Sequence, residues 1–211
     1  MSQLNFPGFL LVVEGVDGAG KSTVVRKLAA YCEASGLDYI ASREPTDGQW
    51  GKAVRQSALT GRLSLEEELE LFLKDRREHV EKLIRPALAA GRVIILDRYY
   101  LSTAAYQGAR GADPEKILAE NEHFAPAPDL ALLLDLPPVD GLIRVKTRGD
   151  VPNEFEREQT LTEVRRIFLS IDRPWIARVN AGRDPEEVAG ECIAKFERAR
   201  EAKMEGLGES Q

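Results

Sequence analysis

The residues with the clearest chemical potential form one short segment near the start of the 211-residue chain. Residues 15–22 read Gly-Val-Asp-Gly-Ala-Gly-Lys-Ser, which is the G-x-x-x-x-G-K-S pattern of a phosphate-binding loop. In such a loop the glycines let successive backbone N–H groups point at one phosphate, toward which the following helix also turns its positive end. Lys21 would then reach the β- and γ-phosphates of a nucleotide, and Ser22 would help to hold Mg²⁺. The residues predicted to contact the nucleotide here are Gly15, Val16, Asp17, Gly18, Ala19, Gly20, Lys21, Ser22 and Thr23.

The sequence on either side of this loop agrees with that prediction. A continuous apolar run, residues 9–13, precedes the loop and is typical of a strand buried on both faces. After the loop, apolar residues recur at helical spacing from Val24 to Cys32. Strand, loop and helix therefore follow in the order that a phosphate-binding loop needs. The intact Gly-Lys-Ser-Thr ending argues against the alternative, an ordinary glycine-rich turn.

Length and composition favour a single domain, residues 1–211, because 43% hydrophobic residues can bury one good core. The formal charge of −6 argues against sequence-independent binding to nucleic acid or to an anionic membrane. Local arginines must therefore bind any phosphate group. Cys32 and Cys192 lie far apart in apolar helical patterns and are predicted to be buried thiols. No targeting segment and no apolar run near the ~20 residues of a membrane helix is evident, so we expect a cytoplasmic protein.

Four further apolar segments are predicted strands, namely residues 39–42, 93–96, 130–136 and, more weakly, 175–179. Helical patterns lie between these strands. We therefore expect an α/β fold with a five-stranded, mainly parallel sheet covered by helices on both faces. In such a sheet, ligands bind at the carboxyl ends of the strands.

Three helices have recognisable ends. The clearest opens at Ser64, where Glu67 completes a capping box, and Pro86 should bend or end it. Asp-Pro pairs predict two more helices, from residue 114 to about 123 and from residue 185 to about 200. The tail of about residues 202–211 has no apolar stripe and is predicted to be frayed or disordered.

Charged residues stand where two of the strands end. Asp97 and Arg98 follow the third strand, and Arg43 follows the second. In a parallel sheet these ends lie on the edge that carries the phosphate loop. There a carboxylate can organise metal-bound water, and a guanidinium can grip a phosphate through two hydrogen bonds. A second anion beside the first is therefore expected, although a strand-ending salt bridge would use the same residue types.

Five strings in the chain together resemble thymidylate kinases in identity, order and spacing, from residue 9 to about residue 200. They are E-G-V-D-G-A-G-K-S-T, R-E-P, F-x-x-x-R, D-R-Y-Y-L-S-T-A-A-Y-Q-G and P-D-L-A-L-L-L-D-L. The fourth string is the most specific, since other kinases share the phosphate loop but rarely this segment. The resemblance implies a P-loop kinase fold with a short lid, and transfer of the γ-phosphoryl group of ATP to dTMP with Mg²⁺. It also implies a homodimer packed through helices.

The resemblance assigns roles around the acceptor phosphate and the sugar. Arg98 and Arg43 would hold or face the acceptor phosphate, and Asp97 would act through the shell of the Mg²⁺ ion. Asp17 would accept a hydrogen bond from the deoxyribose 3′-hydroxyl. Tyr106 resembles the tyrosine that crowds the 2′ position and so favours deoxyribose.

Further roles concern the two bases. Phe72 would place its ring against thymine, and Arg76, one helical turn later, would place a donor near O4. Without the resemblance, a phenylalanine in an apolar stripe would be a core residue and a helical arginine would face solvent. The residues that would complete the surroundings of thymine are Ser102, Thr103 and Gln107, and those that would flank adenine are Arg144, Asn180 and Ala181.

The chain departs from the family pattern at two places. The predicted lid, about residues 147–157, keeps Arg148 and Arg157 as candidate catalytic arginines but lacks the expected Asp-Arg pair at its centre. Asp47 stands in a segment that usually continues Gly-Gly-Thr. These departures leave two alternatives open: a kinase for another nucleoside monophosphate or nucleoside, and a nucleotide-binding regulatory protein with weak turnover.

Overall fold

The predicted strands form one sheet in the structure, a computed structural model that describes residues 8–60, 63–146 and 154–208. The strands are β1 (Phe9–Gly15), β2 (Tyr39–Arg43), β3 (Val93–Asp97), β4 (Leu130–Asp135) and β5 (Ile176–Asn180). The helices are α1 (Lys21–Ala34), α2 (Gln49–Thr60), α3 (Leu65–His79), the π-helical turn η1 (Val80–Ile84), α4 (Arg85–Ala89), α5 (Tyr100–Gly108), α6 (Pro114–Glu122), α7 (Pro138–Lys146), α8 (Glu154–Ser170) and α9 (Pro185–Gly208).

The sheet is parallel throughout, with strand order β2-β3-β1-β4-β5. Every residue of β1 is buried, as expected for a central strand that is covered on both faces. In the register of β1 with β3, Val13 lies opposite Asp97. This register brings the residues that follow both strands to the same edge of the sheet, and the prediction of a five-stranded parallel sheet is confirmed.

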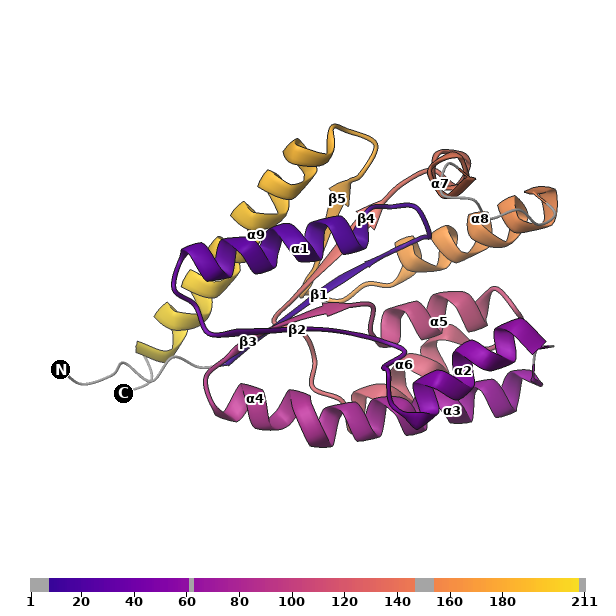
Figure 1. Ribbon diagram of the computed structural model, residues 1–211, viewed down its shortest axis with the longest axis horizontal. Coiled ribbons are helices and arrows are strands. Elements are labelled where there is room, and N and C mark those ends of the chain that lie inside the picture. Colours follow the sequence, from indigo (N-terminus) through magenta and orange to yellow (C-terminus); the bar gives the residue numbers. More distant parts are fainter. Residues whose placement is uncertain (1–7, 61–62, 147–153, 209–211) are drawn as a thin grey trace.

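Helices cover the sheet in two layers (Figure 1). On one face, α1 packs on β1, β2 and β3, and α9 packs on β4 and β5. The rings of Phe9 in β1 and Phe196 in α9 meet edge to face with their centroids 5.3 Å apart. On the other face, α4 contacts β3 and α5 contacts β1. None of the helices in the described parts of the chain could cross a membrane, given their length and polarity.

The helix predicted from Ser64 begins as expected. The Ser64 hydroxyl accepts the Glu67 N–H at 3.2 Å, and the Glu67 carboxylate accepts the Ser64 N–H at 3.0 Å, which completes the capping box. Pro86 does not end the helical segment. The turn before it, η1, is a π-helix in which the Arg85 N–H donates to the Val80 carbonyl, and Pro86 then occupies the first turn of α4. A proline at that position needs no amide hydrogen.

The last helix is longer than predicted, so the expectation of a frayed tail is wrong for residues 202–208, which lie in α9. Lys203 explains the extension. Its ammonium donates to the Gly8 carbonyl at 2.7 Å and to Asp129 Oδ1 at 2.6 Å, while Asp129 also accepts the Leu10 N–H. These partners lie far from Lys203 in the sequence, which is why the local pattern did not reveal them.

Replacing Lys203 by methionine should therefore lower the stability of the fold. The change removes two hydrogen bonds of a charged group, and we expect a loss of about 1–2 kcal/mol, which lowers the melting temperature by a few degrees in a chain of this size. Thermal unfolding followed by circular dichroism measures the shift. Glu201→Ala, at an exposed position of the same helix, is the control. Equal melting temperatures for the Lys203 variant and the wild type would contradict the assigned role of this side chain.

Candidate active site

The phosphate loop leaves the end of β1 and leads into α1. Gly20 caps this helix in a left-handed conformation with φ of +93°, which glycine adopts without strain. The Lys21 ammonium folds back over the loop and donates to the Val16 carbonyl at 2.9 Å. Burial, together with the nearby charge of Arg98, lowers the pKa of Lys21 to about 7. The predicted order of strand, loop and helix is confirmed.

The backbone of the loop also touches helix α7. A methyl group at Gly18 would lie 2.3 Å from the Gly141 carbonyl oxygen, and a methyl group at Gly141 would lie 2.5 Å from the Asp17 carbonyl oxygen. Both distances are too short for non-bonded atoms. Glycine is therefore required on both sides of this contact, and Gly18 additionally has φ of +83°.

Ser22 and Asp97 meet at the carboxyl edge of the sheet. The Ser22 hydroxyl donates to Asp97 Oδ2 at 2.7 Å. A hydroxyl and a carboxylate are hard oxygen ligands, and Mg²⁺ in nucleotide sites takes one or two such protein ligands and completes its shell with phosphate oxygens and water. Within the described ranges, no group of three His, Cys, Asp or Glu residues could hold a metal ion alone. The pair thus fits an ion that is shared with a nucleotide.

Arg98 lies between the phosphate loop and helix α5. Its guanidinium donates to Asp17 Oδ1 at 2.5 Å and to the Ser102 hydroxyl at 3.0 Å, and it lies over the Tyr106 ring, 5.0 Å from the centroid. Four predicted site residues from three segments of the chain are therefore brought together here. Burial raises the pKa of Tyr106 to about 12, so its phenol stays neutral beside this cation.

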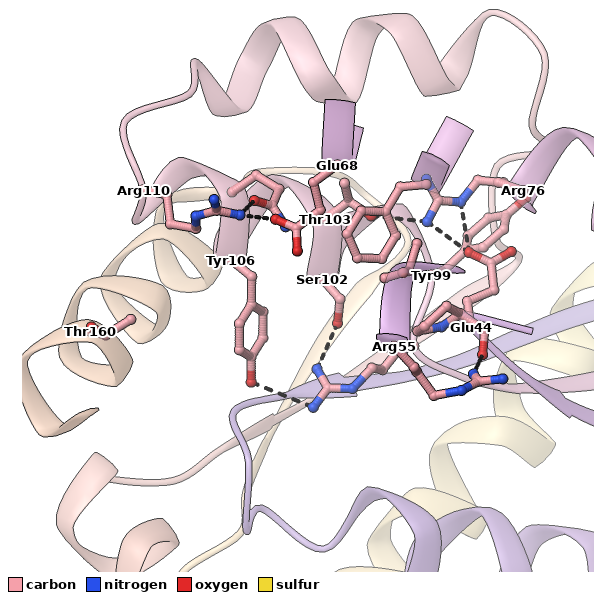
Figure 2. Close-up of a pocket in the computed structure, with 15 residues that line it drawn as sticks. Glu44, Arg55, Glu68, Arg76, Tyr99, Ser102, Thr103, Tyr106, Arg110 and Thr160 are labelled. Atoms are coloured by element: carbon pink, nitrogen blue, oxygen red, sulfur yellow. Dashed lines mark hydrogen bonds and ion pairs between the residues drawn. The ribbon is translucent and has the colours of Figure 1, made fainter. Parts of the chain in front are cut away.

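Beside Arg98 opens a pocket of about 230 Å³. Figure 2 shows side chains from several elements that project into it. Its lining consists of Glu44, Pro45, Val54, Arg55, Glu68, Phe72, Arg76, Arg98, Tyr99, Ser102, Thr103, Tyr106, Gln107, Arg110 and Thr160. Seven of these had been predicted to bind the acceptor, namely Phe72, Arg76, Arg98, Ser102, Thr103, Tyr106 and Gln107. The pocket combines several cations with aromatic rings, as a nucleotide requires.

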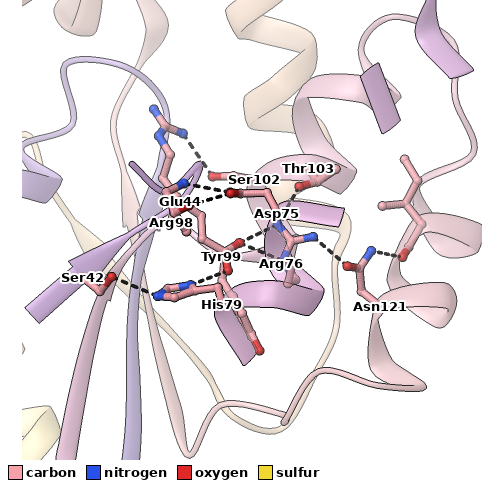
Figure 3. Close-up of polar contacts among 12 residues, drawn as sticks. Ser42, Glu44, Asp75, Arg76, His79, Arg98, Tyr99, Ser102, Thr103 and Asn121 are labelled. Atoms are coloured by element: carbon pink, nitrogen blue, oxygen red, sulfur yellow. Dashed lines mark hydrogen bonds and ion pairs between the residues drawn. The ribbon is translucent and has the colours of Figure 1, made fainter. Parts of the chain in front are cut away.

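Arg76 does not face solvent but is 1% exposed, and its guanidinium is held on several sides (Figure 3). It donates to Glu44 Oε2 at 2.7 Å, to Asn121 Oδ1 at 2.6 Å and to the Thr103 hydroxyl at 3.0 Å. Glu44 is in turn held by His79 Nδ1 at 3.0 Å. A buried arginine with this many partners has a fixed orientation, so one wall of the pocket is rigid.

Arg43, the last residue of β2, and Arg55 of α2 differ in their relation to this pocket. Arg43 is largely exposed and donates to Asp47 Oδ1 at 2.8 Å, and it does not belong to the pocket lining. Arg55 of α2, which sequence reasoning missed, does line the pocket. Its guanidinium donates to the Pro45 and Thr46 carbonyls at 2.8 and 2.7 Å and to Asp47 at 2.9 Å. No local pattern in the sequence had indicated Arg55 as a pocket residue.

A second pocket of about 280 Å³ lies on the other side of the phosphate loop. It is lined by Gly18, Ala19, Gly20, Thr23, Val24, Arg144, Ala181, Arg183, Pro185 and Val188. Arg144 donates to the Ala181 carbonyl at 3.2 Å, so two predicted adenine neighbours meet there. Asn180 is not part of this lining, and its side chain accepts the Gly182 N–H. Arg183 is an additional basic residue that had not been predicted.

The lid arginines cannot be placed in the same way. Arg148 lies outside the described residues. Arg157 belongs to α8, whose backbone is described, but its side chain lies outside the description. Both remain predictions.

The strand order of the sheet and the glycine loop at the end of β1 are those of a P-loop protein. One of the two pockets adjoins this loop as a nucleotide site, and the other is a second, arginine-lined site. A family model described as thymidylate kinase matches residues 13–192. The chain belongs to the thymidylate kinase family, and the predictions of this family, of its fold and of an ATP-dependent nucleoside monophosphate kinase are confirmed.

Relatives that bear the name thymidylate kinase are similar over most of their length. The protein of Akkermansia muciniphila is 54% identical over 182 residues, which cover 86% of this chain and 88% of the relative. The protein of Xanthomonas campestris pv. campestris is 52% identical over 187 residues, covering 89% and 82%. That of Xanthomonas oryzae pv. oryzae is 48% identical over 201 residues, covering 95% and 88%.

Glu14, at the end of β1, is a fully buried acid that sequence reasoning did not assign. Burial raises the pKa of its carboxyl to about 7, in spite of the Ser102 hydroxyl and the Arg98 charge, which lower it. Because its ordinary value is 4.5, the folded state binds more protons than the unfolded chain between pH 4.5 and 7. The stability that this group contributes is therefore complete below pH 4.5 and is lost as the pH rises through 7.

Glu14→Gln should remove this pH dependence, because glutamine stays neutral. The wild type loses the stability contributed by Glu14 as the pH rises, whereas the variant does not. The unfolding free energy of the variant minus that of the wild type should therefore increase by on the order of 2–3 kcal/mol between pH 4.5 and pH 7.5. Urea unfolding at a series of pH values measures the difference. Glu33→Gln, at an exposed position of α1, should follow the wild-type curve. Parallel curves for the wild type and the Glu14 variant would rule out the raised pKa.

Proposed function

We propose that the protein transfers the γ-phosphoryl group of ATP to dTMP, which gives ADP and dTDP. The observation that carries this proposal is the 2.5 Å contact between Arg98 and Asp17, which joins the phosphate loop to the arginine-lined pocket. A donor phosphate on the loop and an acceptor phosphate at Arg98 would be neighbours. Membership of the thymidylate kinase family supports dTMP as the acceptor.

On the donor side, the backbone amides of residues 15–23 and the Lys21 ammonium would hold the phosphates of ATP. Ser22 and Asp97 would hold Mg²⁺ together with these phosphates. When bound, this ion neutralises charge that develops on the β- and γ-phosphates. Arg144 and Ala181 would flank the adenine in the second pocket. Arg148 and Arg157 remain candidates for an additional cation that reaches the transferred group.

On the acceptor side, Arg98 and Arg55 would bind the phosphate of dTMP. The second pKa of a phosphate monoester is near 6, so this nucleophile is already ionised at neutral pH and needs no general base. What the reaction requires is neutralisation and alignment of two polyanions, which cations in fixed positions provide. Arg43, which is paired with Asp47 outside the pocket lining, becomes a lesser candidate for this role.

The remaining pocket residues would bind the nucleoside. Phe72 would stack on thymine, and Arg76 would offer a donor to O4 from the rigid wall. Thr103 and Gln107 line the pocket nearby and would complete the polar contacts with the base. Tyr106, whose ring lies against Arg98, would exclude a 2′-hydroxyl.

We also propose that the protein acts as a cytoplasmic homodimer. The family resemblance supports the dimer, and two buried free thiols, Cys32 and Cys192, suit a reducing compartment. Light scattering coupled to size-exclusion chromatography measures the mass in solution directly. A mass equal to that of one chain would exclude the dimer.

ADP release from Mg-ATP should be fastest with dTMP among the common nucleoside monophosphates and nucleosides. Lys21→Ala is the blank, since loss of this cation should reduce transfer by at least about a thousandfold. A coupled assay with each acceptor in turn measures the rates. Faster turnover with a different acceptor would replace dTMP in the proposal. Tight ATP binding without transfer to any acceptor would indicate a regulatory protein.

Arg98→Ala should lower kcat/KM for dTMP by about a hundredfold to a thousandfold, because a preorganised cation at the acceptor phosphate is removed. The KM for ATP should stay within about twofold of the wild-type value, since this residue lies outside the second pocket. Arg144→Ala is the matched arginine variant and should show the reverse pattern, with ATP affected and dTMP spared. Unchanged dTMP kinetics in the Arg98 variant would remove this residue from the acceptor site.

A further inference from the structure

Arg98 has a backbone conformation that must be held in place. Its φ of +71° lies in the left-handed region, and within the described part of the chain no other residue except glycine has a positive φ. A side chain costs about 1–2 kcal/mol in this region, and the conformation persists only where the surroundings fix it. The residue proposed to hold the acceptor phosphate is therefore also a strained one.

Hydrogen bonds on both sides of Arg98 fix its backbone. Its own N–H donates to the Val13 carbonyl at 3.0 Å, and the next amide, of Tyr99, donates to Glu14 Oε1 at 2.8 Å. The same oxygen accepts the Ser102 N–H at 3.2 Å. Tyr99 is the N-cap of α5, so Glu14 satisfies N–H groups at the start of this helix from the neighbouring strand.

The Glu14 carboxylate also reaches the side chain of Arg98 through one hydroxyl. The Arg98 guanidinium donates to the Ser102 hydroxyl at 3.0 Å, as Figure 3 shows, and this hydroxyl donates in turn to Glu14 Oε2. A hydroxyl that both accepts and donates has its orientation fixed at both ends, and consecutive bonds of this kind polarise one another. Glu14 is thus connected to Arg98 through the backbone and through the side chain.

We infer that Glu14 is a positioning residue, which orients the Arg98 guanidinium toward the acceptor phosphate through Ser102 and the Tyr99 amide. The inference rests on the proposed function, because it takes Arg98 as the ligand of that phosphate. Glu14 is 0% exposed and does not belong to the pocket lining, so it acts through its neighbours and not by contact with the substrate. Without it, Asp17 remains as the acidic partner that draws the guanidinium toward the phosphate loop.

Glu14→Gln tests this role with little change of shape. The amide oxygen can still accept from the Tyr99 and Ser102 N–H groups, but the NH₂ group cannot accept the Ser102 hydroxyl proton. We expect the KM for dTMP to rise about tenfold, with a smaller change of kcat and an unchanged KM for ATP. Steady-state kinetics with each substrate varied separates these constants.

Ser102→Ala removes the hydroxyl that connects Arg98 to Glu14. It provides an independent test if the Glu14 variant folds poorly. Its KM for dTMP should rise by a similar factor. The double variant should differ little from either single variant, because both changes interrupt one chain of hydrogen bonds. Effects that multiply in the double variant would mean that the two residues act separately, and would overturn the inference.

Asp129→Asn is the matched control. It also removes a carboxylate that accepts a backbone N–H, that of Leu10 at 2.8 Å, but at the opposite end of β1. Its KM for dTMP should equal that of the wild type even if its melting temperature falls. If the wild type phosphorylates dTMP and Arg98→Ala raises the KM, while the Glu14 and Ser102 variants match the wild type, the inference is wrong and the proposed function stands. If the wild type does not phosphorylate dTMP, the proposed function fails, and the inference with it.

Discussion

The structure depends above all on the parallel pairing of β1 with β3, in which Val13 lies opposite Asp97. This register places the phosphate loop and the Asp97-Arg98 pair at one edge, so that Ser22 meets Asp97 and the Arg98 N–H meets the Val13 carbonyl. A slip by one residue would turn every side chain of a strand to the opposite face. Both candidate phosphate sites would then be lost together, because each takes residues from the segments that follow both strands.

The arginine-lined pocket owes its shape to a buried network of polar and charged side chains. Arg76, Glu44 and His79 are each less than a tenth exposed, and they are connected by hydrogen bonds that also include Asn121 and Thr103. Burying ions is costly unless each finds partners, and a network with all members satisfied holds its side chains in one arrangement. The wall against which a base would lie is therefore preorganised before any ligand arrives, which reduces the entropy lost on binding.

Local patterns predicted the strands, the phosphate loop and the capping box at Ser64, because each depends on a few adjacent positions. The pocket residues Phe72 and Arg76 were predicted only through the resemblance to a family, since their local patterns alone indicated a core residue and a solvent-facing one. Local patterns failed where the partner is distant. Helix α2 has a glycine in its first turn and was not among the helices predicted from the sequence, so Arg55 was missed. The extension of α9 depends on Lys203, whose partners lie at the start of β1 and before β4. Nothing near Glu14 in the sequence indicates that it will accept from α5.

The contact between Gly18 and Gly141 has a mechanical and an evolutionary consequence. The backbones of the loop and of α7 lie against each other there with no side chain between them. Displacement of the loop toward α7 must therefore move this helix as well. Neither position can acquire a side chain while the other stays where it is. A substitution at either glycine alone is therefore not tolerated in this arrangement. A different spacing between loop and helix would require coordinated changes in two segments that lie more than a hundred residues apart in the sequence.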